Sequence, residues 1–546
     1  MEENVAMRVG ISRRTLILIA LVIACLLGGV LVYYGTNWGP WTDDDSSEYF
    51  EAARNFASGY GMVLIRASGR VSPLASRPPF YAVVLSIAPL TGIDLLVYAR
   101  WLNIFLFVGF LLLIGPISFI LFENVLLSSL LLGSMLVSSS MLINFTSGLA
   151  EPLFFFLGTA SLFLMLYYLR SSRYSALYGS AVLAGLSTLT RLSGAAFVGA
   201  GAIAVIVFSR QTIKRRFLNA FYYCLASLFT LTPWLYGVFN RGSTPGSYLF
   251  DFNNLWGRLA GARLGFTEVG WSLIPFNTYL PNFQYRVKLT VEMLTIVLAI
   301  VILVAVLKHR RGEGESDWLQ AGKLHLASIF SVFTFTYILV FLFSHLFMQI
   351  PQAMVIQRHL SPIEFGAIFA ITAFACLIIE HYKKPRWGII LLLIVSFGLV
   401  IPNARASKSL LAELNDRGRG HTSRAWHQSD LIQVISEFPD DLILISNEIE
   451  AMIIWTNRAA YRVPEVWNKT TLEEFERFGD NHEDIVQNLF SEEGAALVLF
   501  DSINRQFGVI YGDAASRRLE VFIEGLSPYY EGMDGTIYFY DERILN

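Results

Sequence analysis

Three consecutive carboxylates, Asp43, Asp44 and Asp45, follow the first apolar run of the chain, in "GPWTDDDSSEYFEAARNFASGYG" (39–61). Adjacent carboxylates repel one another, so the run is costly unless a cation, a hydrogen-bond donor or water offsets the charge. Beside low-dielectric surroundings this repulsion raises carboxylate pKa values, which suits a general base that deprotonates a hydroxyl. Asp43 and Asp45 can instead ligate a divalent cation. Both roles are steps of group transfer, and the sequence leaves both open.

A helix cap is the alternative explanation of the same residues. From Tyr49 onward, apolar residues recur at intervals of three and four, which predicts a short amphipathic helix suited to a membrane surface. These residues are Tyr49, Ala52, Ala53, Phe56 and Tyr60. Asp45 and Glu48 stand three apart at its start, which is the acidic form of a capping box. A cap explains Asp45, but it does not require two further acids.

Other charged residues interrupt or border apolar runs. Glu151, in "TSGLAEPLFF", stands at a predicted helix start, where a carboxylate in a membrane is costly and usually functional. The alternative is a helix-end acid exposed to water. Arg77, Arg191 and Arg358 carry guanidinium groups, which are always charged and fork-shaped and therefore suit phosphate. Their alternative role is to reach from the bilayer to lipid headgroups.

The composition indicates a membrane protein. The 546 residues are 54% hydrophobic and only 15% charged, whereas an average soluble domain carries about 25% charged residues. A net charge of -2 lacks the basic footprint of a nucleic-acid binder, so no nucleic-acid partner is expected. The three cysteines lie inside apolar runs and are interpreted as core residues rather than as disulfide or metal ligands.

The apolar runs predict a polytopic α-helical membrane protein with about eleven transmembrane helices. They lie near residues 15–35, 98–121, 125–143, 150–169, 174–190, 194–208, 217–238, 289–307, 323–346, 360–381 and 387–402. With the N-terminus inside, the basic clusters that flank these runs all fall in cytoplasmic loops. The topology therefore predicts a cytoplasmic N-terminus and an extracytoplasmic C-terminus. The first run resembles a signal peptide in part, but it is long and lacks a clear cleavage site, so we expect it to be retained.

The chain is expected to divide into a transmembrane module, 1–402, and a soluble tail, 403–546. The module carries two predicted outer loops, 36–97 and 239–288. The tail contains "DLILISNEIEAMIIW", "GAALVLFDS" and "GTIYFYDE", whose patterns predict a strand and helix, a buried strand and an edge strand. A small extracytoplasmic α/β domain fits this order. His421 and His427 in the tail are expected to face solvent.

The first outer loop resembles that of GT-C membrane glycosyltransferases, in the PMT/ArnT-like branch (RgtA/B/C/D-like domains). The resemblance rests on Asp45-Ser46-x-x-Tyr49, Ala52-Ala53-Arg54-Asn55, Gly59 and Arg77-Pro78-Pro79-x-Tyr81. It continues in "YARWLNIFLF", "SSSMLINFTSGLAEPLFFFLGTASLF", "LAGLSTLTRLSG", "TLTPWLYG" and "RHLSPIEFG". It covers the order and spacing of elements from residue 1 to about residue 380.

The resemblance implies an enzyme that takes a sugar from a polyprenyl-phosphate carrier and transfers it outside the cytoplasmic leaflet. In that family an acid of the first outer loop is catalytic. Asp45 matches by its spacing to the tyrosine, and Asp44 remains open as the neighbour. Glu151 matches an acid that faces the active-site cavity. Arg358 and His359 stand where the family commonly has an Arg-aromatic pair, with His in place of the usual Tyr.

The resemblance therefore implies an integral-membrane glycosyltransferase that inverts the anomeric centre and acts on a lipid, glycan or protein acceptor. The residues expected to bind substrate are Arg77, Arg191, Arg358, His359 and Tyr49; Tyr49 and Tyr81 have interfacial anchoring as their alternative role. No cofactor is certain, and a divalent cation stays open. The competing interpretations are a transporter or lipid flippase, which expects charges near mid-membrane and repeated halves, and an inactive surface-binding relative.

Overall fold

The computed structural model describes residues 13–67, 69–74, 77–122, 125–240, 255–272, 318–347, 357–381, 385–463, 494–523 and 525–539. Its contacts group the chain into two compact units. The helical unit consists of Met1–Asn37, Ala75–Tyr81 and Val97–Asn415. The sheet unit consists of Trp38–Leu74, Ala82–Leu96 and Asp416–Asn546.

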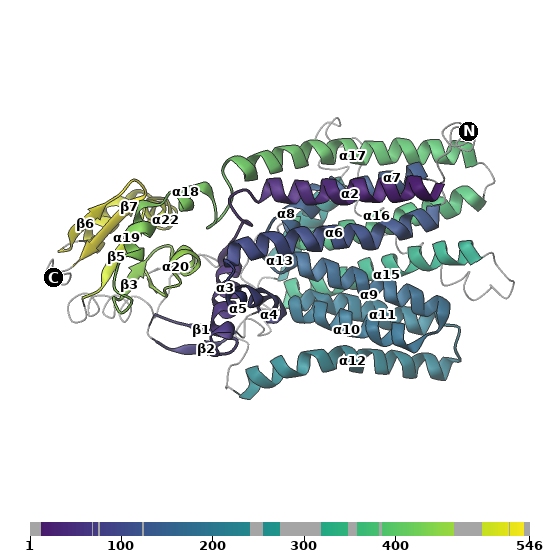
Figure 1. Ribbon diagram of the computed structural model, residues 1–546, viewed down its shortest axis with the longest axis horizontal. Coiled ribbons are helices and arrows are strands. Elements are labelled where there is room, and N and C mark those ends of the chain that lie inside the picture. The colour runs from purple at the N-terminus through teal and green to yellow at the C-terminus, as the bar shows by residue number, and fades with distance from the viewer. Residues whose placement is uncertain are drawn as a thin grey trace. The chain divides into compact units, whose positions relative to one another are not determined.

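The helical unit is built from long apolar helices that run alongside one another (Figure 1). They are α2 (Arg13–Gly35), α6 (Leu95–Phe122), α7 (Val125–Leu136), α8 (Ser139–Phe145), α9 (Glu151–Ser171), α10 (Tyr174–Thr190), α11 (Ala195–Phe208), α12 (Ile213–Asn240), α13 (Leu255–Ser272), α15 (Trp318–Phe347), α16 (Gln357–His381) and α17 (Pro385–Asp416). A short 3-10 helix, η1 (Leu192–Gly194), precedes α11. Helix α9 packs on α10, α10 on α12, α11 on α12 and α15, and α15 on α16.

Four of the described helices are long and apolar enough to cross a membrane. The four segments are Thr15–Gly35, Leu95–Phe119, Glu151–Ser171 and His325–Phe347. A fifth span results if Ser128–Leu136 and Ser139–Phe145, which meet at a bend of 53°, count as one. These helices mark a multi-pass membrane protein. The predicted span at 289–307 lies outside the described residues, and the total of about eleven stays a prediction.

Two predicted spans differ from the helices observed. The run near 125–143 is divided into α7 and α8, because the Ser138 hydroxyl accepts the Met141 N–H at 3.3 Å and caps a new helix there. The last predicted span, 387–402, is extended: α17 continues through Pro402 to Asp416. The helix therefore passes the expected boundary between the transmembrane module and the tail.

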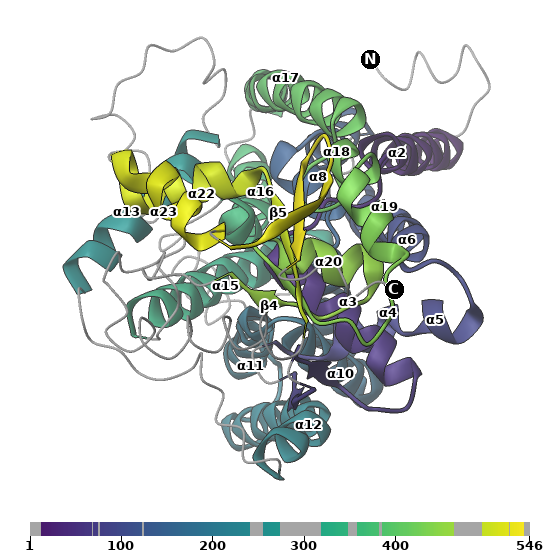
Figure 2. The ribbon, with the colours of Figure 1, turned by 90° about the vertical axis from the view of Figure 1, so that its left-hand side faces the viewer.

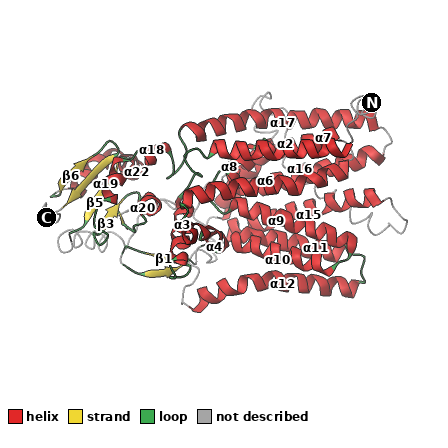
Figure 3. Cartoon of the chain, in the orientation of Figure 1, coloured by secondary structure: helices red, strands yellow, loops and turns green. Residues whose placement is uncertain are grey.

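The sheet unit contains a five-stranded mixed sheet of order β4-β3-β5-β7-β6. Its strands, yellow in Figure 3, are β3 (Leu444–Ser446), β4 (Tyr461–Arg462), β5 (Ala496–Phe500), β6 (Ser527–Glu531) and β7 (Gly535–Phe539). Strand β3 is parallel to β4 and β5, while β7 is antiparallel to β5 and β6. In register, Leu497 of β5 lies opposite Ile445 on one side and Tyr538 on the other.

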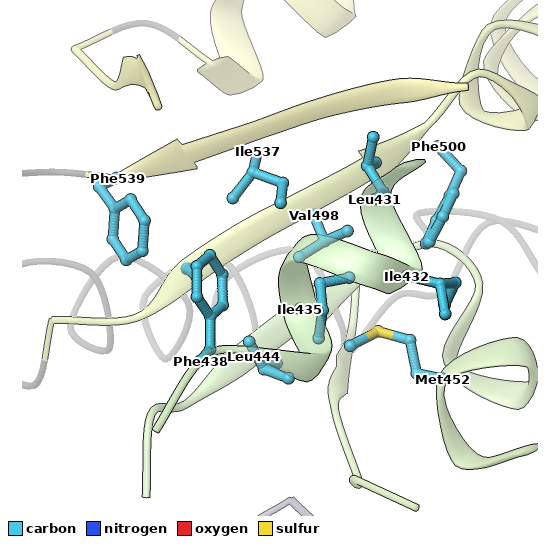
Figure 4. Close-up of a cluster of buried hydrophobic side chains, with 11 residues drawn as sticks. Leu431, Ile432, Ile435, Phe438, Leu444, Met452, Val498, Phe500, Ile537 and Phe539 are labelled. Carbon is cyan, nitrogen blue, oxygen red and sulfur yellow. The ribbon is translucent and has the colours of Figure 1, made fainter. Parts of the chain in front are cut away.

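Helices cover both faces of this sheet, as Figure 2 shows around β5. They are α18 (Arg424–His427), α19 (Asp430–Ser436), α20 (Ile449–Thr456), α22 (Ser502–Tyr511), η4 (Gly512–Ala514) and α23 (Ala515–Ile523). Alternate residues of a strand point to opposite faces. Val498 and Phe500 accordingly pack with Leu431 and Ile435 of α19 (Figure 4), whereas Leu497 and its neighbour Leu499 pack toward α22.

Elements of the first predicted outer loop belong to the same compact unit as this sheet. They are α3 (Asp44–Ala57), β1 (Val63–Ile65), β2 (Val71–Pro73), the latter part of α4 (Phe80–Leu85), and α5 (Ile87–Thr91). Strands β1 and β2 form an antiparallel hairpin. Helix α3 packs on β1, α5 and α20. The sequence assigns this loop to the transmembrane module, whereas its helix α3 contacts α20 of the tail in the structure.

Candidate functional site

The acidic run lies at the N-terminus of α3, and its three carboxylates have different surroundings. Asp43 is the N-cap: its Oδ1 accepts the Asp45 N–H at 3.1 Å. The Ser46 hydroxyl in turn accepts the Asp43 N–H at 3.2 Å. The predicted capping box of Asp45 and Glu48 is therefore wrong, because the helix begins two residues earlier than that box requires. Asp44 and Asp45 instead lie in the first turn, where the helix dipole stabilises negative charge.

The predicted apolar face of α3 is largely covered within the sheet unit. Tyr49 is 4% exposed, and Ala52 and Ala53 are buried with it, whereas Phe56 and Tyr60 are exposed. The expected membrane-surface helix is thus held mainly by protein contacts. Tyr49 remains a predicted substrate contact, but its side chain is buried in this structure.

Two charged residues of α3 hold it to its neighbours, and the sequence gave neither of them a role. Arg54 donates to the Ile453 carbonyl at 2.7 Å and to the Ile454 carbonyl at 2.9 Å, both in α20. Glu51 accepts the Ile65 N–H of β1 at 2.5 Å. Burial raises the pKa of Glu51, although this hydrogen bond acts in the opposite direction. A local sequence pattern cannot predict these contacts, because the partners lie far away along the chain.

A buried ion cluster in the helical unit unites three predicted site residues. Glu151 is the first residue of α9, where Pro152 follows it in the first turn. It forms an ion pair with Arg191, the residue between α10 and η1. Arg358 Nε, in the first turn of α16, lies 3.9 Å from Glu151 Oε1. Three helix ends that are distant in the sequence thus converge on one carboxylate.

In this cluster the Glu151 carboxylate faces two guanidinium groups, those of Arg191 and Arg358. The Glu151 side chain is 4% exposed and that of Arg358 10%, whereas that of Arg191 is 25% exposed. Buried charge is tolerated only where it is paired, and the more accessible guanidinium has the fork geometry that phosphate requires.

His359 and Arg77 complete the predicted set within this unit. The His359 carbonyl accepts the Tyr337 hydroxyl of α15 at 2.7 Å, which fixes the start of α16 beside the cluster. Arg77 is half-buried in the turn before Pro78 and α4. Tyr81, which has interfacial anchoring as its expected role, is fully buried.

Glu364 is a buried carboxylate in α16 that the sequence analysis missed. Its Oε2 accepts the Ser140 hydroxyl at 2.7 Å, and its Oε1 accepts the Ser138 hydroxyl at 3.3 Å. Ser138 is the residue at which α7 and α8 are divided. Glu364 thus stabilises the bend of this span. The signal that could have found it is a carboxylate inside an apolar run, since such residues are costly in a membrane.

A short series of hydrogen bonds connects this bend with Arg358. The Asn144 amide of α8 donates to the Ser361 hydroxyl at 2.9 Å. Ser361 donates to the Arg358 carbonyl at 2.6 Å. Both residues are buried. The position of α8 and the position of the arginine-bearing turn are therefore coupled through polar contacts.

His421 is not the solvent-facing residue that the sequence predicts. Its side chain is 13% exposed, and its Nε2 lies 3.6 Å from Glu448 Oε2. Burial lowers the pKa of His421. The hydrogen bond and charge of Glu448, together with the charges of Glu450 and Asp44, raise this pKa by more than burial lowers it, so the net shift is upward. His427 is exposed, as expected, with its Nε2 2.8 Å from the Trp38 carbonyl.

Within the described part of the chain, no three Asp, Glu, His or Cys side chains gather in a group that could hold a metal ion. Asp43 and Asp45 are therefore not part of such a group there, and Asp43 Oδ1 accepts a backbone N–H in the helix cap. Much of the predicted outer loop 239–288 lies outside the described residues, which include from it the end of α12 and α13.

Comparison with known proteins gives a structural likeness. No family model matches the chain, and no curated protein matches its sequence. ArnT from Cupriavidus metallidurans bound to undecaprenyl phosphate is similar with a TM-score of 0.55 and 11% identity, over 96% of this chain and 98% of that one. The archaeal oligosaccharyltransferase AglB from Archaeoglobus fulgidus, in complex with an inhibitory peptide and a dolichol-phosphate, has a TM-score of 0.52 and 10% identity, over 97% and 75%. At these identities the likeness concerns the fold, and the chain has the fold of GT-C membrane glycosyltransferases.

Proposed function

We propose that this protein is an integral-membrane glycosyltransferase that moves a sugar from a polyprenyl-phosphate-linked donor to an acceptor on the extracytoplasmic face. The observation that carries the proposal is the buried cluster of Glu151 with Arg191 and Arg358. Its two guanidinium groups suit a phosphate-bearing substrate in a chain with the GT-C fold. The similar ArnT structure has undecaprenyl phosphate bound, which agrees with a lipid-phosphate donor.

In the proposed reaction, a carboxylate of the first turn of α3 takes the proton from an acceptor hydroxyl. The acceptor oxygen then bonds to the anomeric carbon of the sugar, while the bond from that carbon to the phosphate oxygen breaks. The electron pair leaves with the polyprenyl phosphate. Because the acceptor attacks from the side opposite the leaving group, a single displacement inverts the anomeric centre. A second carboxylate nucleophile is not needed.

Asp45 is the preferred base and Asp44 its alternative. The helix cap supports this choice, since the carboxylate of Asp43 already accepts a backbone N–H. Asp45 has the spacing to Tyr49 on which the resemblance rests, whereas Asp44 is the more exposed of the two.

Arg191 and Arg358 are proposed to neutralise the charge that grows on the departing phosphate. Fixed donors aimed at developing charge supply a large part of enzymatic rate enhancement. Glu151 is then a positioning residue, because it orients both guanidinium groups. Arg77, His359 and Tyr49 are proposed to contact the donor or acceptor.

The test is transfer from a radiolabelled polyprenyl-phosphate sugar in membranes that contain wild-type, Asp45→Asn, Asp44→Asn or Asp43→Asn protein at matched expression. We expect Asp45→Asn alone to abolish transfer, while Asp43→Asn, which keeps a capping side chain, retains it. Equal transfer by all variants would refute the assigned base. No transfer by the wild type from any donor tried would favour a transporter, a flippase or a surface-binding protein.

A further inference from the structure

Two neighbouring parallel strands of the sheet unit, β3 and β5, are followed by helices on opposite faces of the sheet. Strand β3 has β4 on one side and β5 on the other. Helix α20 follows β3, and its Met452 packs with Val498 on one face (Figure 4). Helix α22 follows β5, and its Phe507 packs with Leu497 on the other face. Where helices diverge in this way, ligands bind at the carboxyl ends of the parallel strands.

Polar side chains gather at the carboxyl ends of β3 and β5, and the function proposed above gives them no role. Asn447 and Glu448 follow β3, and Ser502 begins α22 after β5. Asn447 Oδ1 accepts the Phe500 N–H at 2.9 Å, and its Nδ2 donates to the Ser502 hydroxyl at 2.9 Å. Glu448 Oε1 accepts the Ser502 hydroxyl at 2.5 Å and the Gln506 amide at 3.0 Å. These hydrogen bonds hold the two strand ends in a defined arrangement.

His421 is held at this edge of the sheet through one of its ring nitrogens. Its Nε2 lies 3.6 Å from Glu448 Oε2, and its backbone carbonyl accepts the Trp455 indole N–H at 2.7 Å. Its Nδ1 is buried and has no hydrogen-bond partner among the residues that the structure describes. In a protonated imidazole both ring nitrogens are donors, and a buried donor without a partner is costly. A ligand atom that accepts a hydrogen bond is therefore stabilised at Nδ1.

The charges around His421 favour a neutral ligand. Burial lowers the pKa of His421, but the hydrogen bond and charge of Glu448, with the charges of Glu450 and Asp44, raise it overall. An anion gains little beside the imidazolium, because Glu448 already balances its charge. A cation is repelled by the Nδ1–H donor. A hydroxyl is neutral and can both accept from an imidazole and donate to a carboxylate, so it fits this position.

An aromatic side chain adds an apolar surface to the same place. The rings of Trp426 and His421 have their centroids 6.0 Å apart, and Trp426 lies 4.9 Å from the ring of Phe500 at the end of β5. Trp426 is only partly buried. Binding sites for small molecules combine such apolar surfaces with a few placed polar groups. A sugar ring offers both hydroxyl groups and apolar C–H groups, whereas a peptide carbonyl offers only an acceptor.

This edge lies beside the acidic turn of α3, which belongs to the same unit. Gly420, the residue before His421, pairs with Thr42 in an isolated β-bridge. A Cβ at Gly420 would overlap the Thr42 carbonyl, so this approach requires glycine. The charge of Asp44 acts on His421, and α20 packs on α3. A sugar bound at this edge is therefore close to the turn that carries the proposed base.

We propose that the edge formed by Asn447, Glu448, Ser502, Gln506 and His421 binds a neutral saccharide, and that this saccharide carries the acceptor hydroxyl. The first statement stands on the contacts within the sheet unit, whereas the second rests on the proposed function. Among a lipid, a glycan and a protein, the acceptor is therefore assigned as a glycan.

The experiment measures binding of the purified full chain to an array of immobilised oligosaccharides, in a polyoxyethylene detergent that carries no sugar. The probes are neutral oligosaccharides of hexoses and pentoses, sulfated forms of the same oligosaccharides, and neutral peptides. The site variants are His421→Phe, which keeps an aromatic ring, and Glu448→Gln, which keeps the size of the side chain. The matched control is His427→Phe, the same substitution at an exposed histidine of α18. Thermal unfolding verifies that each variant is folded.

The wild type and the control are expected to bind a neutral oligosaccharide, and its affinity should fall at least about tenfold in both site variants. The sulfated form should bind more weakly than its neutral parent. The proposal is overturned if the wild type binds no neutral oligosaccharide, if both site variants bind as the control does, or if only peptides show the dependence on His421 and Glu448.

A transfer assay separates this inference from the proposed function. The oligosaccharide that binds is added to wild-type membranes with the radiolabelled polyprenyl-phosphate sugar, and label should enter it. Transfer to other acceptors, with no label in this oligosaccharide, would overturn its assignment as acceptor and leave the proposed function in place. Binding without transfer to any acceptor would count against the proposed function, but not against the saccharide site.

Discussion

Asp43 caps the helix on which Asp45 lies: the carboxylate of one accepts the backbone N–H of the other at 3.1 Å. The two acids therefore have different roles: Asp43 caps the N-terminus of the helix, and Asp45 lies in its first turn. This division separates the effects of substitutions that remove the same charge.

Asp43→Ala should lower stability without removing the proposed base. Loss of a capping side chain costs about 1 kcal/mol, which lowers the thermal midpoint of unfolding by a few degrees. Asp43→Ser restores a capping oxygen and should recover that midpoint. The measurement is thermal unfolding of the detergent-purified chain beside a transfer assay. An Asp43→Ser protein as inactive as Asp45→Asn would contradict the division.

Glu151→Gln should be strongly destabilising, because it leaves Arg191 and Arg358 without their carboxylate. Removal of one partner from a buried ion pair costs roughly 3–5 kcal/mol. The double variant Glu151→Gln/Arg191→Gln should recover part of this loss, since less uncompensated positive charge remains. Transfer should stay low in both. Unfolding by denaturant gives the coupling free energy, and strictly additive effects would show that the pair does not couple.

Stability of the sheet unit should depend on pH through His421. Its pKa is raised above the ordinary 6.5 in the folded chain, so the folded state binds this proton more tightly than the unfolded state does. The resulting stabilisation is complete below 6.5 and is lost as pH rises through the higher folded-state pKa.

The measurement compares thermal midpoints of wild type and His421→Gln from about pH 5.5 to about pH 8.5. The advantage of the wild type should shrink over this range. Glu448→Gln, which removes the main raising partner, should flatten the difference. A difference that grows with pH would have the wrong sign.

Glu364→Ala should destabilise the helical unit, because the Ser138 and Ser140 hydroxyls lose a buried acceptor. Because the two hydroxyls lie 2.9 Å apart and can still bond each other, one of them is left without an acceptor, which costs about 1–3 kcal/mol. Glu364→Gln keeps one acceptor oxygen and should be milder. Thermal unfolding ranks the variants, and hydrogen exchange of α7 and α8 locates the change. Equal exchange in wild type and Glu364→Ala would argue against a role in holding the bend.

Local sequence patterns were enough to mark three charged residues that the structure brings together. Glu151 before a proline marked the start of α9, and Arg191 marked the break between two apolar runs, and the structure brings both together with Arg358. The long apolar helices follow from hydropathy alone. The likeness to the GT-C fold agrees with the resemblance in the first outer loop.

The sequence did not predict features that depend on distant partners or on backbone geometry. His421 was expected to face solvent because Glu448, its partner, lies in another element. The helix cap was misplaced because two overlapping acid patterns fit the same stretch, and only the backbone geometry selects Asp43 with Ser46. The division of α7 from α8 arises from a serine cap within an apolar run, which hydropathy does not detect.

The sheet unit is assembled from chain segments made at different times. Trp38–Leu74 and Ala82–Leu96 are synthesised first, whereas the rest begins only at Asp416. At roughly 5–20 residues per second, the early segments wait on the order of tens of seconds while the intervening helices are made. During that interval α3 lacks α20, so the hydrogen bonds from Arg54 to that helix form only after α20 has emerged.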